Sequence, residues 1–491
     1  MPVIFSSPYF LFLYFPAVLL LYYITPLRGR NLVLLIVNLI FYGWGEPVYV
    51  LIMFLSIAID YSHGRIVTTC KAKGNDKGAR MAVASSVVFN LLLLGFFKYW
   101  DFIVGSLSTL GLDLVTREEI RSAINAALAN IGLKPLFQAG SSTLPIGISF
   151  YTFQTMSYTI DVYRGDARRQ KNIVTFGTFV TLFPQLIAGP IIKYKDLDDQ
   201  LEHRDHSFEK FASGVQRFTI GACKKVLLAN ALGPLWDVYL ATPGEQLTTL
   251  GAWLGIVAFS LQLYFDFSGY SDMAIGLGRM LGFEFLENFN YPYLSKSASE
   301  FWRRWHISLG SWFREYLYFP LGGSRVGPAR MVFNLLVVWA ATGIWHGASW
   351  NFLLWGLYFA ALLILEKAVL LRVLEKLPRA LQHLYAIFLA VVSWAIFAVE
   401  DLGHLGVYLK AMFGFAQGGL ADGAFRYHLV SYLPVLMIAA VASTPLGVKL
   451  WKRLPERPMK LILPVLLLAG LTLSTAYLVD ATYNPFLYFR F

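Results

Sequence analysis

Apolar runs of membrane-spanning length recur along the whole chain, and no long polar stretch separates them. A helix that crosses the hydrocarbon of a bilayer needs about 20 apolar residues. Of the 491 residues, 57% are hydrophobic and 14% are charged, whereas soluble domains carry about 25% charged residues. We therefore predict an all-α polytopic membrane protein, folded as one membrane-embedded domain over residues 1–491 instead of as several soluble domains.

Several of the apolar segments are short or interrupted by Gly and Pro. They lie near residues 9–25, 31–44, 47–62, 81–99, 145–162, 173–192, 211–230, 247–265, 331–344, 349–366, 383–399, 430–446 and 461–479. This pattern predicts roughly 11 to 13 transmembrane helices together with re-entrant and interfacial helices. The clearest interruption is residues 183–190. Irregular backbone at membrane depth persists where protein or a wet cavity satisfies its polar groups, so we expect this segment to line a cavity.

The basic residues collect in short loops on one side of the predicted spans. Arg28 and Arg30 follow the first span, and further clusters lie within 65–80, 164–171 and 449–460. The positive-inside rule places these loops in the cytoplasm. We therefore expect a bacterial inner-membrane protein, surrounded by lipids, with both termini in the periplasm. The first apolar run lacks a basic leader and a cleavage site, so it is expected to be retained.

The net charge of +11 is spread over these loops instead of forming one patch, so a nucleic-acid partner is not expected. Cys70 and Cys223 are far apart and neither belongs to a Cys-x-x-Cys pair, which argues against a disulfide or a zinc site. His203 and His206 have a spacing that could bind a metal, but their charged neighbours are typical of a solvated loop. No metal is therefore expected.

Polar and ionisable residues concentrate between residues 264 and 356, among several tryptophans. The ionisable residues include Asp266, Asp272, Glu284, Glu287, Glu300, Arg303, Arg304, His306, Arg314, Glu315 and His346. Such groups near a bilayer interior are costly unless they pair or line a cavity, which predicts a functional site. An interfacial amphipathic helix over 299–318 is the alternative. We favour it for the tryptophans, which would lie in the aromatic belt, but not for the histidines.

His346 lies between the apolar runs 331–344 and 349–366. The first run spans only about 21 Å as a helix, short of the roughly 30 Å hydrocarbon, so His346 should lie below the membrane surface. A histidine at low dielectric stays neutral and can take a proton from a hydroxyl. Gly343 and Gly347 would allow close approach of backbone or substrate. A single histidine at a helix junction is more often structural, so the residues alone leave both roles open.

His306 lies 40 positions earlier, directly after Trp305. If this segment is helical, Trp302, Trp305 and His306 share a face and the two arginines between them point elsewhere. Arg303 and Arg304 suit phosphate groups such as those of coenzyme A. Anchoring at lipid headgroups explains the arginines equally well. Signatures of serine hydrolases, zinc proteases and phosphate-loop enzymes are missing from the sequence.

Ordered motifs extend over nearly the whole chain. They are residues 5–8 (FSSP), 144–154 (LPIGISFYTFQ), 183–185 (FPQ), 188–190 (AGP), 266–272 (DFSGYSD), 300–309 (EFWRRWHISL), 316–323 (YLYFPLGG), 345–347 (WHG) and 486–491 (FLYFRF). In order and number they resemble the membrane-bound O-acyltransferase (MBOAT) family. The similarity is to its bacterial branch, whose members O-acetylate polysaccharides such as alginate. The members that transfer D-alanine to teichoic acids resemble the chain more distantly.

The resemblance implies a ring of transmembrane helices around a central catalytic tunnel, with a catalytic core over about 144–366. It also implies that His346 is the active-site histidine and His306 the second histidine of the bacterial branch. The candidates for binding substrate or donor lie within the motifs: Asp266, Trp302, Arg303, Arg304, Trp305, Trp345 and Gln154.

The implied reaction is transfer of an acetyl group from cytosolic acetyl-CoA, without a bound cofactor, toward hydroxyls of an exported polysaccharide. His346 would be the general base, a role worth about 10²–10⁴ in rate. His306 would orient the donor, stabilise the oxyanion or share the proton. A periplasmic acetyltransferase or the export machinery is the expected partner, and an acetyl-histidine intermediate stays open. D-Alanyl transfer from a carrier protein to teichoic acid and a membrane transporter are the alternatives.

Overall fold

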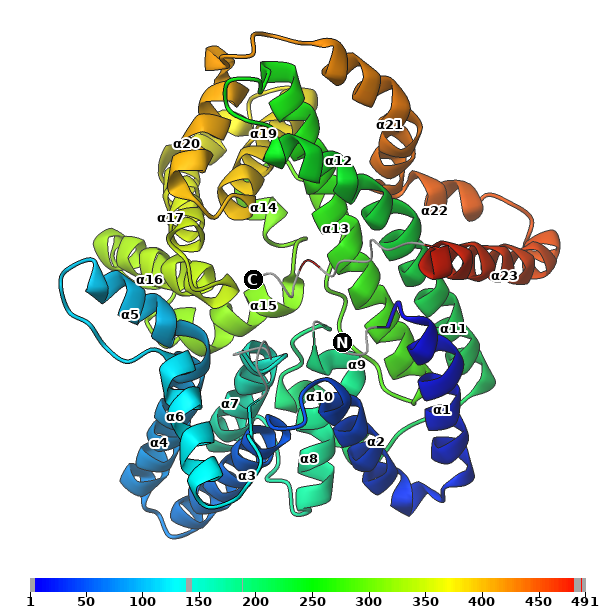
Figure 1. The fold of residues 1–491 in the computed structure, drawn as a ribbon. Coiled ribbons are helices and arrows are strands. Elements are labelled where there is room, and N and C mark those ends of the chain that lie inside the picture. The colour runs from blue at the N-terminus through cyan, green and yellow to red at the C-terminus, as the bar shows by residue number, and fades with distance from the viewer. Residues whose placement is uncertain (1–4, 138–143, 188, 481–486, 488–491) are drawn as a thin grey trace. The chain divides into compact units, whose positions relative to one another are not determined.

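The computed structural model describes residues 5–137, 144–187, 189–480 and 487, and in these residues all regular structure is helical (Figure 1). This confirms the predicted all-α class. The chain forms two compact units, the first of residues 1–211 with 278–285 and the second of 212–277 with 286–491. The single domain that we expect over residues 1–491 stays a prediction. Ala188 and the closing motif 486–491, apart from Leu487, lie outside the described residues.

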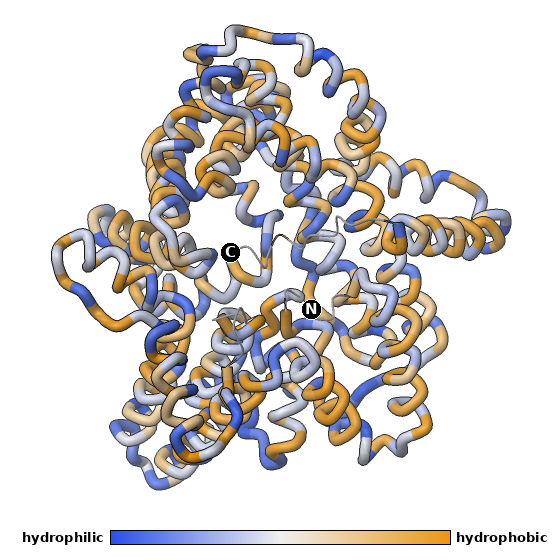
Figure 2. Tube along the Cα trace, viewed as in Figure 1, coloured by the Kyte–Doolittle hydropathy of each residue, from blue (hydrophilic) through white to orange (hydrophobic). Residues whose placement is uncertain are grey.

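Seven helices within this described part are long and apolar enough to cross a membrane. They span Val50–Ala72, Asp76–Ser108, Thr249–Met280, Pro328–His346, Arg379–Ala398, Gly423–Ala442 and Arg457–Asp480. The last of these is hydrophobic over most of its length in Figure 2. The sequence predicts roughly 11 to 13 transmembrane helices. Each of the remaining apolar segments also contains a helix, but these helices do not meet the same length and hydropathy.

The first unit holds the N-terminal helices. They are η1 (Phe10–Tyr14), α1 (Phe15–Ile24), η2 (Leu27–Gly29), α2 (Arg30–Gly45), α3 (Val50–Ala72), α4 (Asp76–Leu94), η3 (Gly95–Tyr99), α5 (Trp100–Ser108), α6 (Arg117–Asn130), α7 (Ile148–Arg164), α8 (Ile173–Thr181), α9 (Phe183–Leu186) and α10 (Tyr194–Glu202), where η marks 3₁₀ and π-helical turns. α8 ends at Thr181, and the predicted interruption 183–190 begins with the four residues of α9, after which its described residues are not helical. Asn38 accepts a hydrogen bond from the Phe183 N–H, and Gln185 donates to the Phe179 carbonyl, so protein groups satisfy the irregular backbone.

The second unit holds the remaining helices, apart from the first residues of α11 and the last of α13. They are α11 (Phe208–Cys223), η4 (Lys224–Ala229), α12 (Asn230–Ala241), α13 (Thr249–Met280), η5 (Pro292–Leu294), α14 (Ala298–Phe301), α15 (Ile307–Phe313), η6 (Arg314–Tyr318), α16 (Pro328–His346), α17 (Trp350–Leu365), η7 (Glu366–Leu370), α18 (Leu371–Leu374), α19 (Arg379–Ala398), α20 (Leu402–Lys410), η8 (Ala411–Phe415), α21 (Gly423–Ala442), α22 (Leu446–Trp451) and α23 (Glu456–Asp480).

Glycines bring α11 and α13 into backbone contact. A Cβ on Gly221 would lie 2.5 Å from the Gly269 carbonyl oxygen, and one on Gly276 would lie 2.6 Å from the Gly214 carbonyl oxygen. Small residues at such crossings let membrane helices approach closely. The close approach places Lys225 of η4, which directly follows α11, 2.6 Å from the buried carboxylate of Asp266 on α13.

The amphipathic helix expected over 299–318 does not form as one element. α14 ends at Phe301, α15 begins at Ile307, and His306 between them has a left-handed φ of 44°. The condition under which Trp302, Trp305 and His306 would share a helical face is therefore not met. A local pattern could not reveal the break, because the partner of His306 is Asn288, a residue 18 positions earlier in the chain.

Candidate active site

The α16–α17 hairpin positions His346. A Cβ on Gly343 would lie 2.3 Å from the Phe352 carbonyl oxygen, and one on Gly356 would lie 2.3 Å from the Trp339 carbonyl oxygen. Both positions therefore require glycine for the two backbones to meet. The close approach predicted at Gly343 and Gly347 is thus made by protein groups, since Gly347 packs against the Phe352 ring.

His346 is the last residue of α16 and is 7% exposed. Three aromatic rings meet its imidazole edge to face, with centroids 5.1 Å (Trp345), 5.0 Å (Trp355) and 5.3 Å (Phe397) away. Aromatic walls exclude water and strengthen electrostatic interactions at the ring. The structure therefore places this histidine in an enclosed apolar setting, as the sequence predicts.

His306 is 1% exposed, and its imidazole is held by Asn288. Oδ1 of Asn288 accepts hydrogen bonds from the Ser308 backbone N–H (3.2 Å) and the Ser308 hydroxyl (2.9 Å), which identifies it as the amide oxygen. Nδ1 of His306, 3.1 Å from the same oxygen, must therefore carry the proton. Nε2 is buried and has no hydrogen-bond partner among the described residues. His306 thus presents a lone pair on Nε2.

The indole of Trp345 contacts both histidines. Its ring centroid lies 6.0 Å from that of His306 and 5.1 Å from that of His346. Residues 40 positions apart in the sequence therefore meet at one aromatic ring. Burial disfavours the charged imidazolium and lowers the pKa of His306, which lies between two of the spanning helices, to about 3. The imidazole is neutral at physiological pH.

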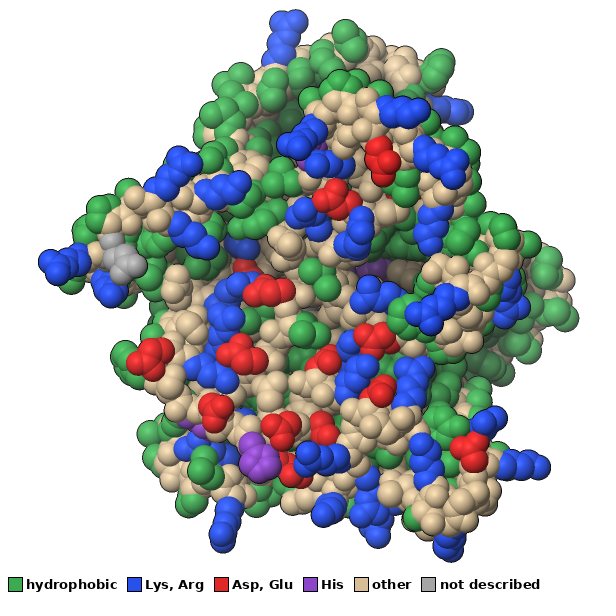
Figure 3. All heavy atoms as spheres, turned by 180° about the vertical axis from the view of Figure 1, so that it is seen from behind, with side chains coloured by type: hydrophobic (Ala, Val, Ile, Leu, Met, Phe, Trp, Pro, Cys, Tyr) green, Lys and Arg blue, Asp and Glu red, His purple; other side chains and the backbone are tan. Residues whose placement is uncertain are grey.

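A pocket of about 300 Å³ opens beside His306. It is lined by Ser299, Trp302, Arg303, His306, Ile307, Leu309, Gly310, Ser311, Phe313, Arg314, Tyr318, Leu335, Val338, Trp339, Thr342, Leu363 and Lys367. We call it the His306 pocket. The space-filling view in Figure 3 shows a hollow with a histidine at depth and Lys or Arg side chains nearby.

The His306 pocket carries three exposed cations, Arg303, Arg314 and Lys367. None of them forms an ion pair with a described carboxylate. The indole N–H of Trp302 and the hydroxyl of Tyr318 also line the pocket, and both are buried without a hydrogen-bond partner in the described part of the chain. The pocket thus combines free positive charge, unused donors and the lone pair of His306, an arrangement that suits an anionic ligand with a reactive carbonyl group.

Glu366 holds the segment that leads to His306. Its two carboxylate oxygens accept hydrogen bonds from the backbone N–H groups of Ala298 (2.6 Å) and Ser299 (2.8 Å) at the start of α14. The hydroxyl of Tyr385 donates a third, at 3.2 Å. A carboxylate suits a helix N-terminus because the free N–H groups and the helix dipole are positive there. The side chain is 0% exposed, so it fixes α14 from inside the protein.

The other predicted site residues occupy different surroundings. Trp305 is buried and stacks on Phe301, with centroids 5.6 Å apart, and Arg304 pairs with Glu300 at 2.8 Å. Asp266 pairs with Lys225 and also accepts the Leu487 backbone N–H. Gln154 is buried in α7 of the first unit, where both its polar atoms have no hydrogen-bond partner among described residues.

The aromatic-belt interpretation of the tryptophans is wrong for Trp305, Trp312, Trp339 and Trp345, which are buried, whereas Trp350 is 51% exposed. Large aromatic side chains fill the core of the second unit around both histidines.

Sequence reasoning missed Asn288, Tyr318, Glu366 and Lys367 as site residues. Glu366 could have been noticed as an acidic residue at the end of the apolar run 349–366, where an unpaired charge is costly. Asn288 carries no comparable signal. No group of three or more His, Cys, Asp or Glu residues that could hold a metal ion occurs within the described ranges.

Residues 141–401 match the MBOAT, membrane-bound O-acyltransferase, family. The chain is 41% identical to the probable alginate O-acetylase AlgI of Azotobacter vinelandii, over 91% of this chain and 85% of that protein. It is 30% identical to the peptidoglycan O-acetyltransferase of Helicobacter pylori, over 84% and 80%. It is 32% identical to the teichoic acid D-alanyltransferase of Lacticaseibacillus rhamnosus, over 58% and 74%.

The matched region contains both histidines and the whole His306 pocket. The most extensive of these similarities cover nearly the full length of this chain. The chain therefore belongs to the membrane-bound O-acyltransferase family and is an O-acyltransferase of the membrane.

Proposed function

We propose that this protein transfers an acetyl group from acetyl-CoA to an acceptor hydroxyl for the O-acetylation of an exported polysaccharide. The observation that carries the proposal is the His306 pocket, where a buried neutral histidine adjoins three cations that form no ion pair with a described carboxylate. The acyl donor would bind there. The relatives named above support a polysaccharide acceptor, since one is a probable alginate O-acetylase and another a peptidoglycan O-acetyltransferase.

Arg303, Arg314 and Lys367 would bind the phosphates of coenzyme A. Guanidinium groups match phosphate oxygens in a bidentate way, and a lysine adds a point charge. The indole of Trp302 would donate to the thioester carbonyl oxygen, because its N–H is buried, unpaired and on the pocket wall. A prearranged donor at this position stabilises the oxyanion that forms when the carbonyl carbon is attacked.

His346 would act as the general base. It takes the proton of the acceptor hydroxyl while the hydroxyl oxygen attacks the thioester carbon; the carbon–sulfur bond then breaks, and coenzyme A leaves as a thiolate that regains a proton.

The fixed tautomer of His306 limits the roles that this residue can have in the reaction. With its proton on Nδ1, Nε2 can accept a proton but cannot donate to an oxyanion. Of the roles considered for His306, sharing the proton is the one that its hydrogen bonds support.

The protein would lie in the bacterial inner membrane, with membrane lipids around it. Lys367 follows α17 in a basic loop that the positive-inside rule assigns to the cytoplasm. The His306 pocket would therefore take its donor from the cytosol, and both termini would be periplasmic.

The first acceptor would be a periplasmic acetyltransferase or the polysaccharide export machinery. D-Alanyl transfer is the second candidate, because a teichoic acid D-alanyltransferase is also similar to the chain.

The donor site can be tested with purified protein in lipid vesicles and labelled acetyl-CoA. Replacing Arg303 and Arg314 with Gln should raise KM for acetyl-CoA about tenfold, as expected for the loss of roughly 1.4 kcal/mol of binding, with little change in kcat. Arg372→Gln is the matched control, since this exposed arginine does not line the pocket. An unchanged KM in the double variant would sink the donor assignment.

The transfer step needs a separate measurement. His346→Ala should lower kcat by about 10²–10⁴ while leaving KM for acetyl-CoA near its original value. In cells, ester-linked acetate on the exported polysaccharide should disappear at normal protein levels. If labelled D-alanine from a carrier protein were transferred and acetyl-CoA were not, the acyl group would be D-alanyl instead of acetyl.

A further inference from the structure

A second, larger cavity of about 1000 Å³ lies within the second unit. Its lining combines residues of α11 and α13, the segment 287–291, and α21 with α22. They are Arg217, Ile220, Lys224, Tyr264, Ser268, Asp272, Glu287, Phe289, Asn290, Tyr291, Ile307, Met437, Ile438, Val441, Ala442, Thr444, Gly447 and Val448. We call it the lateral groove. It adjoins the His306 pocket, because Ile307 lines both.

One wall of the lateral groove is apolar and accessible. Met437 and Ile438 are each 59% exposed, and Val441 is 51% exposed. These residues belong to α21, a candidate membrane span of which only 6% is buried inside the protein. Hydrocarbon chains are the natural neighbours of such a wall in a bilayer.

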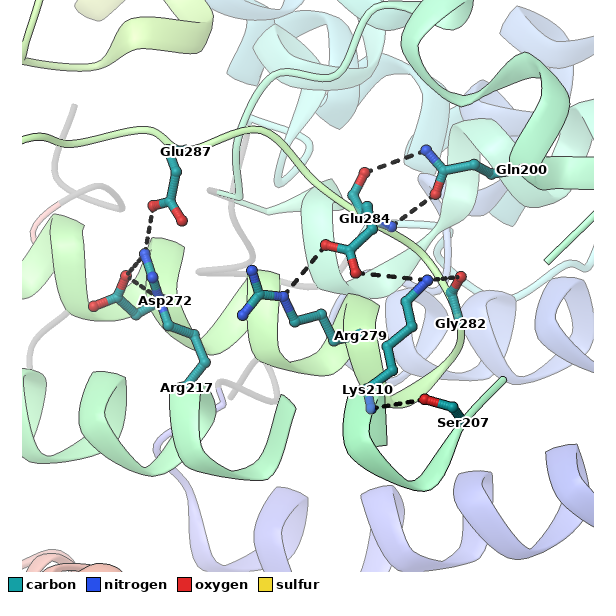
Figure 4. A network of polar contacts seen from close by, with 9 residues as sticks. All are labelled: Gln200, Ser207, Lys210, Arg217, Asp272, Arg279, Gly282, Glu284 and Glu287. Atoms are coloured by element: carbon teal, nitrogen blue, oxygen red, sulfur yellow. Dashed lines mark hydrogen bonds and ion pairs between the residues drawn. The ribbon is translucent and has the colours of Figure 1, made fainter. Parts of the chain in front are cut away.

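The opposite wall carries both signs of charge (Figure 4). Arg217 of α11 lies 2.7 Å from Asp272 of α13 and 2.5 Å from Glu287, and Lys224 lies 2.7 Å from Asp272. Two cations and two carboxylates make this wall neutral overall. Arg217 and Lys224 keep 28% and 27% of their side chains exposed, and Glu287 keeps 50%, so both signs are accessible to a ligand.

An unused hydrogen-bonding group lies in the same groove. Ser268 on α13 is 2% exposed, and its hydroxyl has no hydrogen-bond partner among the residues that the structure describes. Buried hydroxyls are normally paired, so an unpaired one on a cavity wall indicates a polar group of a ligand. The groove thus offers a hydroxyl, accessible charges of both signs and an apolar wall.

We propose that the lateral groove binds a glycerophospholipid with a zwitterionic headgroup, of the phosphatidylethanolamine type. Arg217 and Lys224 face the phosphate, Glu287 faces the ammonium group, and the acyl chains lie along Met437, Ile438 and Val441. A phosphatidylglycerol headgroup carries no cation that could face Glu287, so a wall with both signs of charge favours the zwitterionic headgroup. The lateral groove is separate from the His306 pocket, with which it shares Ile307 alone.

The lipid would support His306 through the segment 287–291. Asn288, which fixes the tautomer of His306, lies in this segment between two residues of the groove wall. The segment is also joined to the histidine loop by the Ile307 N–H to Asn288 carbonyl bond (3.0 Å) and the Asn290 N–H to Arg304 carbonyl bond (2.9 Å). Lipid binding itself is independent of the reaction proposed above, whereas an effect of lipid on the rate rests on that reaction.

Binding can be measured by native mass spectrometry of the full-length protein, extracted in mild detergent and offered equal amounts of phosphatidylethanolamine and phosphatidylglycerol. The wild type should retain phosphatidylethanolamine preferentially. Val441→Trp fills the groove and should lower this retention several-fold. Val430→Trp is the matched control, because Val430 is 72% exposed on the same helix and does not line the groove. Equal retention in both variants, or retention of phosphatidylglycerol alone in the wild type, would overturn the proposal.

Glu287→Gln tests the headgroup without filling the groove. Removing the carboxylate should abolish the preference for phosphatidylethanolamine and raise retention of phosphatidylglycerol, and an unchanged preference would contradict the assigned headgroup. If Val441→Trp fails to fold, this second variant still decides the question. Transfer activity measured in phosphatidylethanolamine and in phosphatidylglycerol vesicles then tests whether bound lipid changes the transfer rate. If the rates are equal while the lipid still binds, the effect on the rate is refuted and the lipid site is not.

Discussion

The burial of His306 determines its protonation state and the dependence of the protein's stability on pH. His306 is 1% exposed, burial lowers its pKa to about 3, and Asn288 binds the neutral form through Nδ1. In an unfolded chain the same imidazole has a pKa of about 6.5. The lone pair on Nε2 is therefore present throughout the physiological range, and activity should not require deprotonation of this residue.

The depressed pKa of His306 makes stability depend on pH. Between about pH 6.5 and pH 3 the unfolded chain binds a proton at this position that the folded protein does not. The stability present above pH 6.5 is thus lost as the pH falls through this window. In detergent, lowering the pH from 7 to 5 should reduce Tm less for His306→Asn than for the wild type. Asn also tolerates the left-handed backbone of this position.

His203→Asn is the control for this comparison, because it also replaces a histidine by Asn but at a side chain that is 73% exposed. It should keep the pH dependence of the wild type. A fall in Tm that is identical for His306→Asn and the wild type would show that His306 is protonated in the folded protein.

At the scale of elements, two short helices, α14 and α15, flank His306, and a distant side chain fixes the first of them. α14 has four residues, too few to be stable by itself. Both carboxylate oxygens of Glu366 bind its first backbone N–H groups, and Lys367, the next residue, lines the His306 pocket. η7 thus anchors α14 on one side and contributes to the donor pocket on the other.

Replacing Glu366 with Gln should therefore impair the donor site. The amide keeps one acceptor oxygen, so one backbone N–H of α14 is left unpaired at a cost of about 1–3 kcal/mol. We expect KM for acetyl-CoA to rise about tenfold and kcat to fall less. Glu366→Asp, which keeps both oxygens, should restore part of the affinity. Glu375→Gln alters an exposed carboxylate nearby and should change neither constant. If all three variants changed kcat and KM by the same factors, the anchoring role of Glu366 would be refuted.

The elements also show how far the sequence could be interpreted. Each predicted span contains a helix, and the described part of the interruption at 183–190 consists of the four-residue α9 and irregular backbone after it, because hydropathy and Pro or Gly placement act locally. The helix expected over 299–318 was wrong, because Asn288 and Glu366 determine that segment from distant positions. Their contacts with His306 and α14 leave no pattern in a single sequence. Both histidines were identified through motifs, while their meeting at Trp345 required the fold.

At the scale of the whole molecule, the two compact units are joined through α11 and α13, each of which runs from one unit into the other. The ring of helices around a central tunnel concerns both units together and stays a prediction from the family resemblance. So does the orientation in the membrane, which decides from which compartment the donor reaches the His306 pocket.

Orientation can be measured with single cysteines in a variant that lacks Cys70 and Cys223. Ala421 lies in an exposed loop before α21, and Lys376 is exposed in the basic loop after α18. The positive-inside rule places the first outside and the second in the cytoplasm. A membrane-impermeant maleimide should therefore label Ala421→Cys in intact spheroplasts, whereas it should label Lys376→Cys only when the membrane has been permeabilised. The opposite pattern would place the His306 pocket toward the periplasm, where cytosolic acetyl-CoA could not reach it.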